Sequence, residues 1–335
     1  MLGTGGQSSS SRPRLALNAI PKNLPIDTRD ESLPSAAVVI ATRHRPDLLD
    51  RCVSALERQS ISPSSVIVVD NSRGDDATRA VAVASGARYL VEPRPGVSHA
   101  RNVGALATTT DVVAYLDDDA VPEPNWLSAL LSEFRDPRVA AVTGRILELG
   151  ELDAVRQSSR GVIFGGPTRV VFDRGTVDWF ERANFGGVGQ GANLAIRRST
   201  LTSWAGFDER LGAGTKMVGA EEHHAIFSLI DRGWRVVYTP AASVHHPYPS
   251  SEAEARRLRL RQLQSTSAYL ALLLTEEKRF RWRTATYGLR VVAGRPVPWR
   301  TEPRGPKLGA WEIARARVTG VTLYLHTRLA RSARR

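Results

Sequence analysis

Residues 112–119 read Val112-Val113-Ala114-Tyr115-Leu116-Asp117-Asp118-Asp119, an apolar run that ends in three consecutive carboxylates. The run has the length and the β-branched content of a buried strand. Because side chains alternate along an extended chain, Asp117 and Asp119 point to one side and Asp118 points to the other. Two carboxylates together at the end of a strand suit a hard divalent cation, which prefers oxygen ligands. Open α/β sheets bind their ligands at that end, although an acidic turn before the next helix would give the same sequence.

Strands and helices alternate on both sides of this segment. Strands are predicted at residues 36–41, 66–69, 89–91, 111–116, 139–143, 192–196 and 234–238. Helices are predicted at residues 46–60, 75–85, 99–107, 125–134, 221–232, 252–274 and 311–330. The alternation over the first half of the chain favours a mostly parallel sheet with helices on both faces, whereas residues 150–190 show no regular period.

The composition is that of a globular protein in a reducing compartment. Hydrophobic residues make up 42% and charged residues 24% of the 335 residues. Cys52, the one cysteine of the sequence, excludes an internal disulfide and falls on the apolar face of a predicted helix. No secretory signal is visible, and the apolar stretch 268–274 is far shorter than the ~18 residues of a membrane-spanning helix. We therefore expect a cytoplasmic protein that is not integral to a membrane.

The positive charge is confined to the C-terminal part. The net charge is +12, yet residues 251–335 alone hold 19 Lys and Arg against 6 Asp and Glu. Anionic lipid, an acidic substrate and nucleic acid are the partners that such a segment suits, and a solvated arginine-rich surface is the alternative. Because no nucleic-acid-binding motif accompanies the basic residues, we expect no nucleic-acid partner.

Six motifs in order resemble the family-2 glycosyltransferases of GT-A fold. They are residues 38–45, residues 67–72 with Asp70-Asn71-Ser72, residues 94–104 with Ala100-Arg101-Asn102, residues 116–119, residues 191–198 with Gly191-Ala192-Asn193, and Ala220-Glu221-Glu222. The resemblance spans residues 36–248. It implies an α/β protein with a Rossmann-like, mostly parallel sheet flanked by helices, followed here by a C-terminal helical extension.

The resemblance also implies a division of the chain. Residues 1–34 would form a flexible leader, and residues 35–250 the GT-A catalytic domain. Within that domain, residues 35–145 would bind the nucleotide and residues 146–250 the acceptor. Residues 251–335 would form the basic helical extension.

The acidic triplet resembles the DxD motif of this family. By that resemblance Asp119 would hold Mg²⁺ or Mn²⁺, and Asp117 would contact the metal, a metal-bound water or the donor ribose. We expect Asp118 to be the least suited to the metal and the most tolerant of replacement. His245 or His246, placed by a short loop after the strand 234–238, would approach the metal or the diphosphate, and the sequence leaves open which one.

Residues for the donor nucleotide follow from the same resemblance. Asp70 would accept a hydrogen bond from the base, and Thr42 and Arg43 would line the pocket. Arg101 would lie beside the diphosphate, which guanidinium chemistry suits. An Asx-turn or a helix N-cap at Asp70 and a surface helix position for Arg101 are the alternatives.

Glu221 and Glu222 match the position of the family's catalytic acids. An inverting transfer needs a base for the acceptor hydroxyl, and Glu222 would be that base, with Glu221 as the second candidate. The family motif is Glu-Asp here, so Glu222 is one methylene longer. Acidic residues in a first helical turn also balance the helix dipole, which is the alternative. Trp204, His223 and His224 would contact the acceptor.

The sequence thus predicts a hexosyltransferase-type enzyme of cell-envelope glycan synthesis. It would transfer a sugar, with inversion, from a nucleoside-diphosphate sugar to a hydroxyl of a glycan, a lipid-linked glycan or a small molecule. A sugar-phosphate nucleotidyltransferase is an alternative, but it needs a glycine-rich loop where the chain has Thr42-Arg43-His44-Arg45-Pro46. A non-catalytic protein that binds sugar nucleotides or glycans is another, against which Asp119 and Glu222 argue.

The last predicted helix carries apolar residues near one face, namely Trp311, Val318, Val321, Leu325 and Leu329. With arginines around it, this helix would either lie on the anionic inner face of the membrane or pack on the catalytic domain. Gly320 in its middle weakens the helix by ~1 kcal/mol relative to Ala.

Overall fold

The computed structural model describes residues 33–150, 162–201, 205–293, 295 and 306–332. Trp204 and residues 1–32 of the expected leader therefore lie outside the described residues. The strands are β1 Ala36–Thr42, β2 Ser65–Asp70, β3 Arg88–Val91, β4 Val112–Asp117, β5 Val121–Pro122, β6 Val139–Glu148, β7 Val162–Phe164, β8 Val170–Phe172, β9 Asn193–Arg197 and β10 Arg235–His246. The helices are α1 Pro46–Leu56, α2 Asp76–Ala84, α3 Val97–Leu106, α4 Trp126–Glu133, α5 Trp179–Asn184, α7 Glu221–Asp231, α8 Glu252–Glu276, α9 Arg281–Val292 and α10 Ala310–Ser332.

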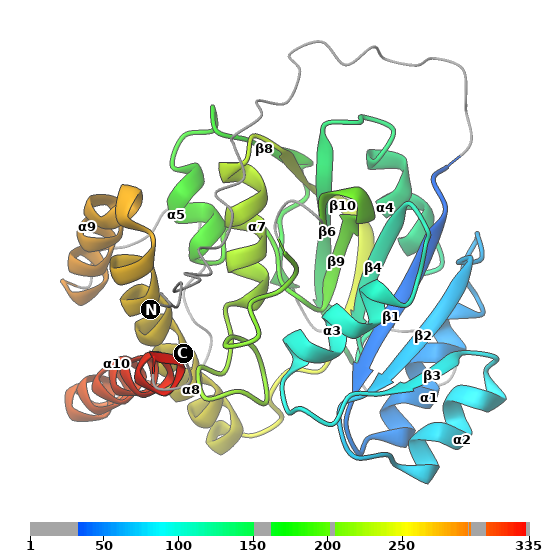
Figure 1. The fold of residues 1–335 in the computed structure, drawn as a ribbon, viewed down its shortest axis with the longest axis horizontal. Helices are drawn as coiled ribbons and strands as arrows, with labels where there is room; N and C mark the ends of the chain where they lie inside the picture. The colour runs from blue at the N-terminus through cyan, green and yellow to red at the C-terminus, as the bar shows by residue number, and fades with distance from the viewer. Residues whose placement is uncertain (1–32, 151–161, 202–204, 294, 296–305, 333–335) are drawn as a thin grey trace, which may run out of the picture.

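These strands form one mixed sheet in the described part of the chain, with the order β3-β2-β1-β4-β9-β6-β10-β5 (Figure 1). β1 pairs in parallel with both β2 and β4, as the alternating pattern predicts. β9 runs antiparallel between β4 and β6, and β10 is parallel to β6. Thr42 pairs with Asp70, and Ala41 with Asp117, so the carboxyl ends of β1, β2 and β4 meet at one edge of the sheet.

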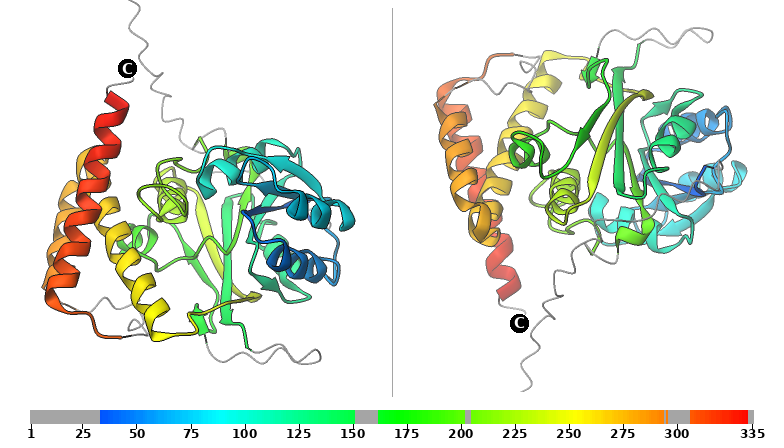
Figure 2. Two further views of the ribbon diagram at one scale, coloured as in Figure 1. Left: turned by 90° about the horizontal axis from the view of Figure 1, so that it is seen from below. Right: turned by 90° about the horizontal axis from the view of Figure 1, so that it is seen from above.

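Helices cover both faces of the sheet, so the predicted α/β class is confirmed (Figure 2). On one face α1 and α4 bury Leu49, Cys52 and Leu127 against the strands. Cys52 is thus a packing residue, as its place on the apolar side of the helix predicts. On the other face α3, α5, α7 and α8 share a second apolar core, which Tyr269 of α8 joins.

β10 is longer than predicted, and this changes the place of two histidines. The strand predicted from the sequence ends at Tyr238. Pro240, whose nitrogen cannot donate a hydrogen bond to a ladder, follows two residues later. In the structure the pairing with β6 shifts register between Thr239 and Ser243, and the strand then continues to His246. The irregularity absorbs Pro240, as bulges do. The predicted loop position of His245 and His246 is therefore wrong, because both are strand residues.

The segment without sequence periodicity folds through aromatic contacts. Trp179 and Phe180 of α5 pack around Phe227 of α7, and the ring of Phe185 stacks on Tyr287 of α9 with 3.7 Å between centroids. These contacts join segments far apart in the sequence. For that reason neither α5 nor α9 is predicted by a local pattern.

The C-terminal helices pack against the domain at a close crossing. A Cβ on Gly320 of α10 would lie 2.1 Å from the carbonyl oxygen of Gln264 in α8, so only glycine allows this approach. Ala316 and Tyr324, on the same side of α10, are buried. No helix in the described ranges combines the length and the apolar character needed to cross a membrane.

Candidate functional site

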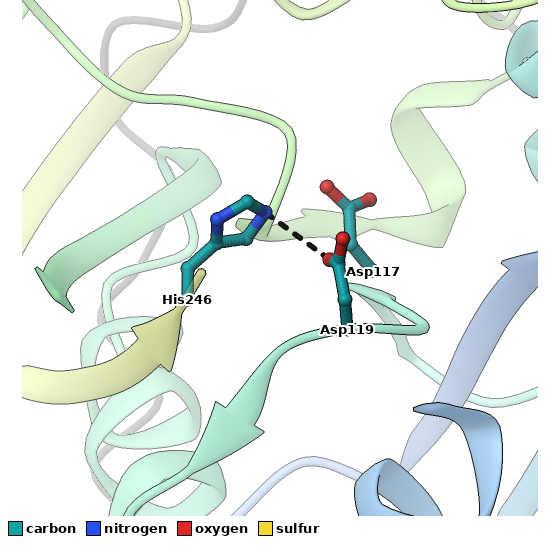
Figure 3. A group of neighbouring side chains, drawn as sticks. All are labelled: Asp117, Asp119 and His246. Atoms are coloured by element: carbon teal, nitrogen blue, oxygen red, sulfur yellow. Dashed lines mark ion pairs between the residues drawn. The ribbon is translucent and has the colours of Figure 1, made fainter. Parts of the chain in front are cut away.

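Two aspartates and a histidine meet at the carboxyl edge of the sheet. Asp117 ends β4, Asp119 follows it, and His246 ends β10. Nε2 of His246 lies 3.1 Å from Oδ1 of Asp119. One ligand atom from each of the three residues lies within 4.8 Å of the others, and Figure 3 shows the three side chains turned toward a common point.

The backbone holds the His246 ring in this orientation. Nδ1 of His246 donates to the carbonyl oxygen of Pro247 over 2.8 Å, which leaves Nε2 for Asp119. Burial alone would lower the pKa of His246, but the hydrogen bond to the Asp119 carboxylate raises it to about 9. His246 thus pairs with Asp119 as a cation when no metal is present.

His245 lies on the opposite side of β10, because neighbouring strand residues alternate. It is buried, and its Nε2 lies 3.2 Å from Oε1 of Glu123. Among the described residues, the potential metal-binding group contains His246 and not His245. The structure therefore removes His245 from the predicted metal ligands.

Asp118 lies in the turn after β4 and is not part of this group, but it is not a free surface residue. It is 5% exposed and accepts hydrogen bonds from Oγ1 of Thr42 over 2.7 Å and from Nη1 of Arg45 over 3.2 Å. Arg45 also lies 3.5 Å from Oδ2 of Asp119. Sequence reasoning gives Arg45 no role in the site. The run Arg43-His44-Arg45 directly after the first strand is the sequence signal that could have identified it.

Thr42 and Arg43, both predicted to bind the donor nucleotide, have different surroundings at the end of β1. Thr42 is buried and holds Asp118, whereas Arg43 is exposed at the rim. Only Arg43 is therefore placed to reach a ligand directly, and Thr42 acts on the site through Asp118.

Asp70 is fully buried at the end of β2 and retains one unused acceptor. Its Oδ2 accepts a hydrogen bond of 2.6 Å from the hydroxyl of Tyr89. Its Oδ1 has no hydrogen-bond partner among the described residues. The alternative of a helix cap does not hold, because Asp75 caps α2.

Arg101 connects the two halves of the site. From α3 it donates to Oδ1 of Asp117 over 2.8 Å and to Oε1 of Glu221 over 2.9 Å. It also donates to the carbonyl oxygen of Gly191, where a Cβ would lie 2.8 Å from the guanidinium. The side chain is only 4% exposed. The alternative of a surface position is therefore wrong, and the guanidinium is engaged by protein groups.

Glu221 and Glu222 open α7 on the far side of Arg101. Burial raises the pKa of both carboxyl groups, and at Glu221 the charge of Glu222 adds to this effect while the Arg101 guanidinium opposes it. The side chain of Glu221 is 9% exposed and that of Glu222 is 16% exposed. Ala220, which precedes them, has a φ of 70°, a conformation that is strained for a residue with a side chain.

The two histidines of α7 point into different surroundings. Nε2 of His223 lies 4.0 Å from Oε1 of Glu222, so His223 stays with the acidic pair. His224 packs against the rings of Phe227 and Tyr269, and burial lowers its pKa. The predicted acceptor contact of His224 is therefore replaced by a packing role between α7 and α8.

Comparisons with known proteins place this arrangement in a family. Residues 37–201 match the model of glycosyl transferase family 2. A pre-mycofactocin glycosyltransferase of Mycobacterium tuberculosis is 32% identical over 218 residues, which are 63% of this chain and 42% of the relative. The O-antigen chain rhamnosyltransferase WbaN of Salmonella anatum is 29% identical over 203 residues, 58% of this chain and 60% of the relative. The chain thus spans about half the length of these curated relatives.

A solved structure shares the fold. The mannosyltransferase PcManGT from Pyrobaculum calidifontis, in complex with GDP-Man and Mn²⁺, aligns with a TM-score of 0.55 over 88% of each chain at 17% identity. The matching family model and the curated relatives show that the chain belongs to the family-2 glycosyltransferases, and the sheet described above, shared with this solved structure, shows their GT-A fold.

Proposed function

We propose that the chain transfers a sugar, with inversion, from a nucleoside-diphosphate sugar to an acceptor hydroxyl. One observation carries the proposal. Arg101 donates hydrogen bonds both to Asp117, which belongs to a group that could hold a metal ion, and to Glu221 of the acidic pair. A displacement of this kind needs charge stabilisation on the leaving diphosphate and a base at the attacking hydroxyl. The two halves of the site offer these two chemistries side by side.

The ligand group fits a divalent metal ion. Asp117 and Asp119 supply carboxylate oxygens, and His246 supplies a ring nitrogen. This set suits Mn²⁺ and also accommodates Mg²⁺ with added waters and phosphate oxygens. Such an ion would stabilise negative charge on the leaving diphosphate. The similar structure of PcManGT, solved in complex with GDP-Man and Mn²⁺, supports this part of the proposal.

The unused acceptor of Asp70 is the proposed contact for the nucleotide base. Tyr89 occupies one carboxylate oxygen, so Oδ1 remains for an N–H donor. Arg43 at the rim would reach the phosphates. Arg101 holds Asp117 in place and contributes to donor binding through that carboxylate.

We assign the base to Glu222 rather than Glu221. Glu221 is held by the Arg101 guanidinium, whereas Glu222 is the more exposed of the pair. A raised pKa brings a carboxylate closer to the basicity that proton abstraction needs near neutral pH. His223 beside Glu222 is the proposed acceptor contact.

The acceptor and the cellular setting are proposed from the relatives. The names of the Salmonella and Mycobacterium proteins point to an O-antigen chain and to pre-mycofactocin. We therefore propose a glycan, a lipid-linked glycan or a small-molecule hydroxyl as acceptor, and the cytoplasm or the inner membrane face as the place of reaction. Residues 35–145 would serve the donor and residues 146–250 the acceptor.

Donor screening tests the proposal. Release of nucleoside diphosphate from UDP-, GDP- and dTDP-sugars would be measured with and without Mn²⁺, and the anomer of any product by NMR. We expect metal-dependent release from at least one donor. Pyrophosphate release from a nucleoside triphosphate and a sugar phosphate, with no nucleoside diphosphate from any donor, would refute transferase chemistry. A retained anomeric configuration would refute the inverting step alone.

A further inference from the structure

The two sides of α10 differ in chemical character. One side packs on α8 through Ala316, Gly320 and Tyr324. The other side exposes large apolar residues, with Trp311 77% and Val318 66% accessible. Together with Val321, Leu325 and Leu329, these exposed residues recur at intervals of three, four and seven positions along the helix. Such intervals place them on one stripe.

α9 likewise has one buried side and one side with exposed apolar residues. Its buried side contains Thr284 and Tyr287, and its outer side exposes Trp282, Leu289 and Val292. Trp282 is 80% accessible. Figure 2 shows α8, α9 and α10 gathered on one side of the molecule, with α10 on the side of α8 away from the sheet. Two exposed apolar stripes therefore belong to the same outer helical layer.

Arginines border each stripe. Arg315 and Arg328 are exposed on opposite sides of the α10 stripe, and Arg281 and Arg290 take the corresponding places on α9. The surplus of 13 positive charges over residues 251–335 makes this layer the basic part of the chain. An apolar stripe between cationic borders matches the boundary between lipid chains and anionic headgroups.

We propose that the outer face of α10, extended by α9, docks in the plane of a membrane that contains anionic lipid. Trp311 and Trp282 would sit at headgroup level, where tryptophan is favoured. A second copy of the chain fits this face less well, because pairing would bring two strongly basic layers together. A nucleic acid would leave the exposed Trp, Leu and Val side chains without an apolar partner.

Vesicle co-sedimentation of the full chain tests this surface without any need for sugar transfer. The probes are vesicles of phosphatidylcholine alone and of phosphatidylcholine with phosphatidylglycerol. We expect binding to the anionic vesicles, at least about tenfold weaker binding to the neutral ones, and loss at high salt, since surface charge is screened. The variant Val318→Ser/Leu325→Ser should bind at least tenfold less, and so should Arg315→Glu/Arg328→Glu.

Matched substitutions on another face provide the controls. Leu106→Ser removes an apolar side chain that is 84% accessible at the end of α3, and Arg58→Glu reverses an exposed charge after α1. Neither should change binding. The proposal is overturned if wild-type protein ignores anionic vesicles, or if the controls lose binding as strongly as the α10 variants. It is equally overturned if light scattering finds a dimer that Val318→Ser/Leu325→Ser dissociates.

Discussion

Arg101 and Glu221 form a buried ion pair, with 2.9 Å between Nη1 and Oε1, and the same guanidinium lies 2.8 Å from Asp117. Two carboxylates from distant segments therefore share one cation. The carbonyl oxygen of Gly191 takes a further N–H of this group. Because Asp117 belongs to the proposed metal site and Glu221 neighbours the proposed base, Arg101 fixes the distance between the two.

Replacing Arg101 by Met should destabilise the protein strongly. The change leaves the buried Glu221 carboxylate and the partly exposed Asp117 carboxylate without their cation, and breaking a buried ion pair from one side costs about 3–5 kcal/mol. Urea unfolding measures the loss. Arg58→Met, at an exposed position, is the control and should change the free energy of unfolding by less than about 0.5 kcal/mol. Comparable stability of the two variants would contradict the bridging role.

Arg101→Lys keeps the charge but lacks the planar group that reaches both carboxylates. We expect a folded protein with kcat reduced by about tenfold or more, because misplacing catalytic groups by about an ångström is costly. The readout is kcat at saturating donor together with the Kd for donor. A variant with wild-type kcat and only weaker donor binding would show that Arg101 serves the donor alone.

Substitution and the pH dependence of the rate should distinguish the roles of Glu221 and Glu222. Glu222→Gln should lower kcat by about 10²–10⁴-fold while donor binding persists, because general base catalysis contributes about that much. Glu221→Gln should cost less. Burial raises the pKa of Glu222 above its usual 4.5, and the base must be deprotonated. The rate should therefore fall as the pH drops through this raised pKa, closer to neutrality than for an ordinary glutamate. A larger kcat loss in Glu221→Gln would transfer the base to Glu221.

The two histidines of β10 provide a matched pair for metal binding. His246→Ala removes a candidate ligand beside Asp119, whereas His245→Ala removes a side chain beside Glu123. Titration calorimetry with Mn²⁺ should show affinity reduced by about tenfold or more in the first variant, since even outer-shell partners contribute about 10–100-fold. The second should bind as the wild type does. An equal loss of Mn²⁺ affinity in the two variants would mean that the direction in which each histidine points from β10 does not determine which one binds the metal.

Asp118→Ala should affect folding rather than the metal. The sequence alone suggests that this aspartate tolerates replacement best, but Thr42 and Arg45 both donate to it in the structure. Leaving a buried donor without a partner costs about 1–3 kcal/mol. Thermal or urea unfolding should show that loss while Mn²⁺ affinity stays within about twofold to threefold. Weaker metal binding in a fully stable variant would place Asp118 among the ligands.

The sequence predicts the parts of this fold that local patterns encode. The ends of β1, β2 and β4 follow from apolar runs that stop at Thr42, Asp70 and Asp117. A parallel sheet brings such ends together, which is why these three candidate residues could be placed at one edge without coordinates. The candidate histidine for the metal could not be chosen, because the register shift around Pro240 sets which of two adjacent residues faces Asp119.

Other features depend on contacts between distant segments and leave no local pattern. Arg101 lies on an ordinary helical stretch, and only the fold shows that Asp117 and Glu221 converge on it. α5 and α9 are held by stacked rings such as Phe185 and Tyr287. Periodicity cannot reveal such pairs, because the two partners are about 100 positions apart.

At Gly320 the contact between α10 and α8 decides whether replacement by alanine raises or lowers the free energy of unfolding. Helix propensity alone says that Gly→Ala within a helix stabilises it by ~1 kcal/mol. At Gly320 the new Cβ would lie 2.1 Å from the carbonyl oxygen of Gln264, so α8 and α10 must move apart. Overpacking of this kind typically costs about 1–3 kcal/mol. Gly320→Ala should therefore lower the free energy of unfolding.

Gly288 in α9 is the matched control, because there the same substitution should change the free energy of unfolding in the opposite direction. A Cβ there meets nothing within 4 Å, so Gly288→Ala should raise the free energy of unfolding by about 0.5–1 kcal/mol through helix propensity. Urea unfolding of both variants compares the two effects on helices of the same layer. Stabilisation by both substitutions would show that α10 does not cross α8 at the close distance described, and would remove the inner packing that turns the apolar stripe of α10 outward.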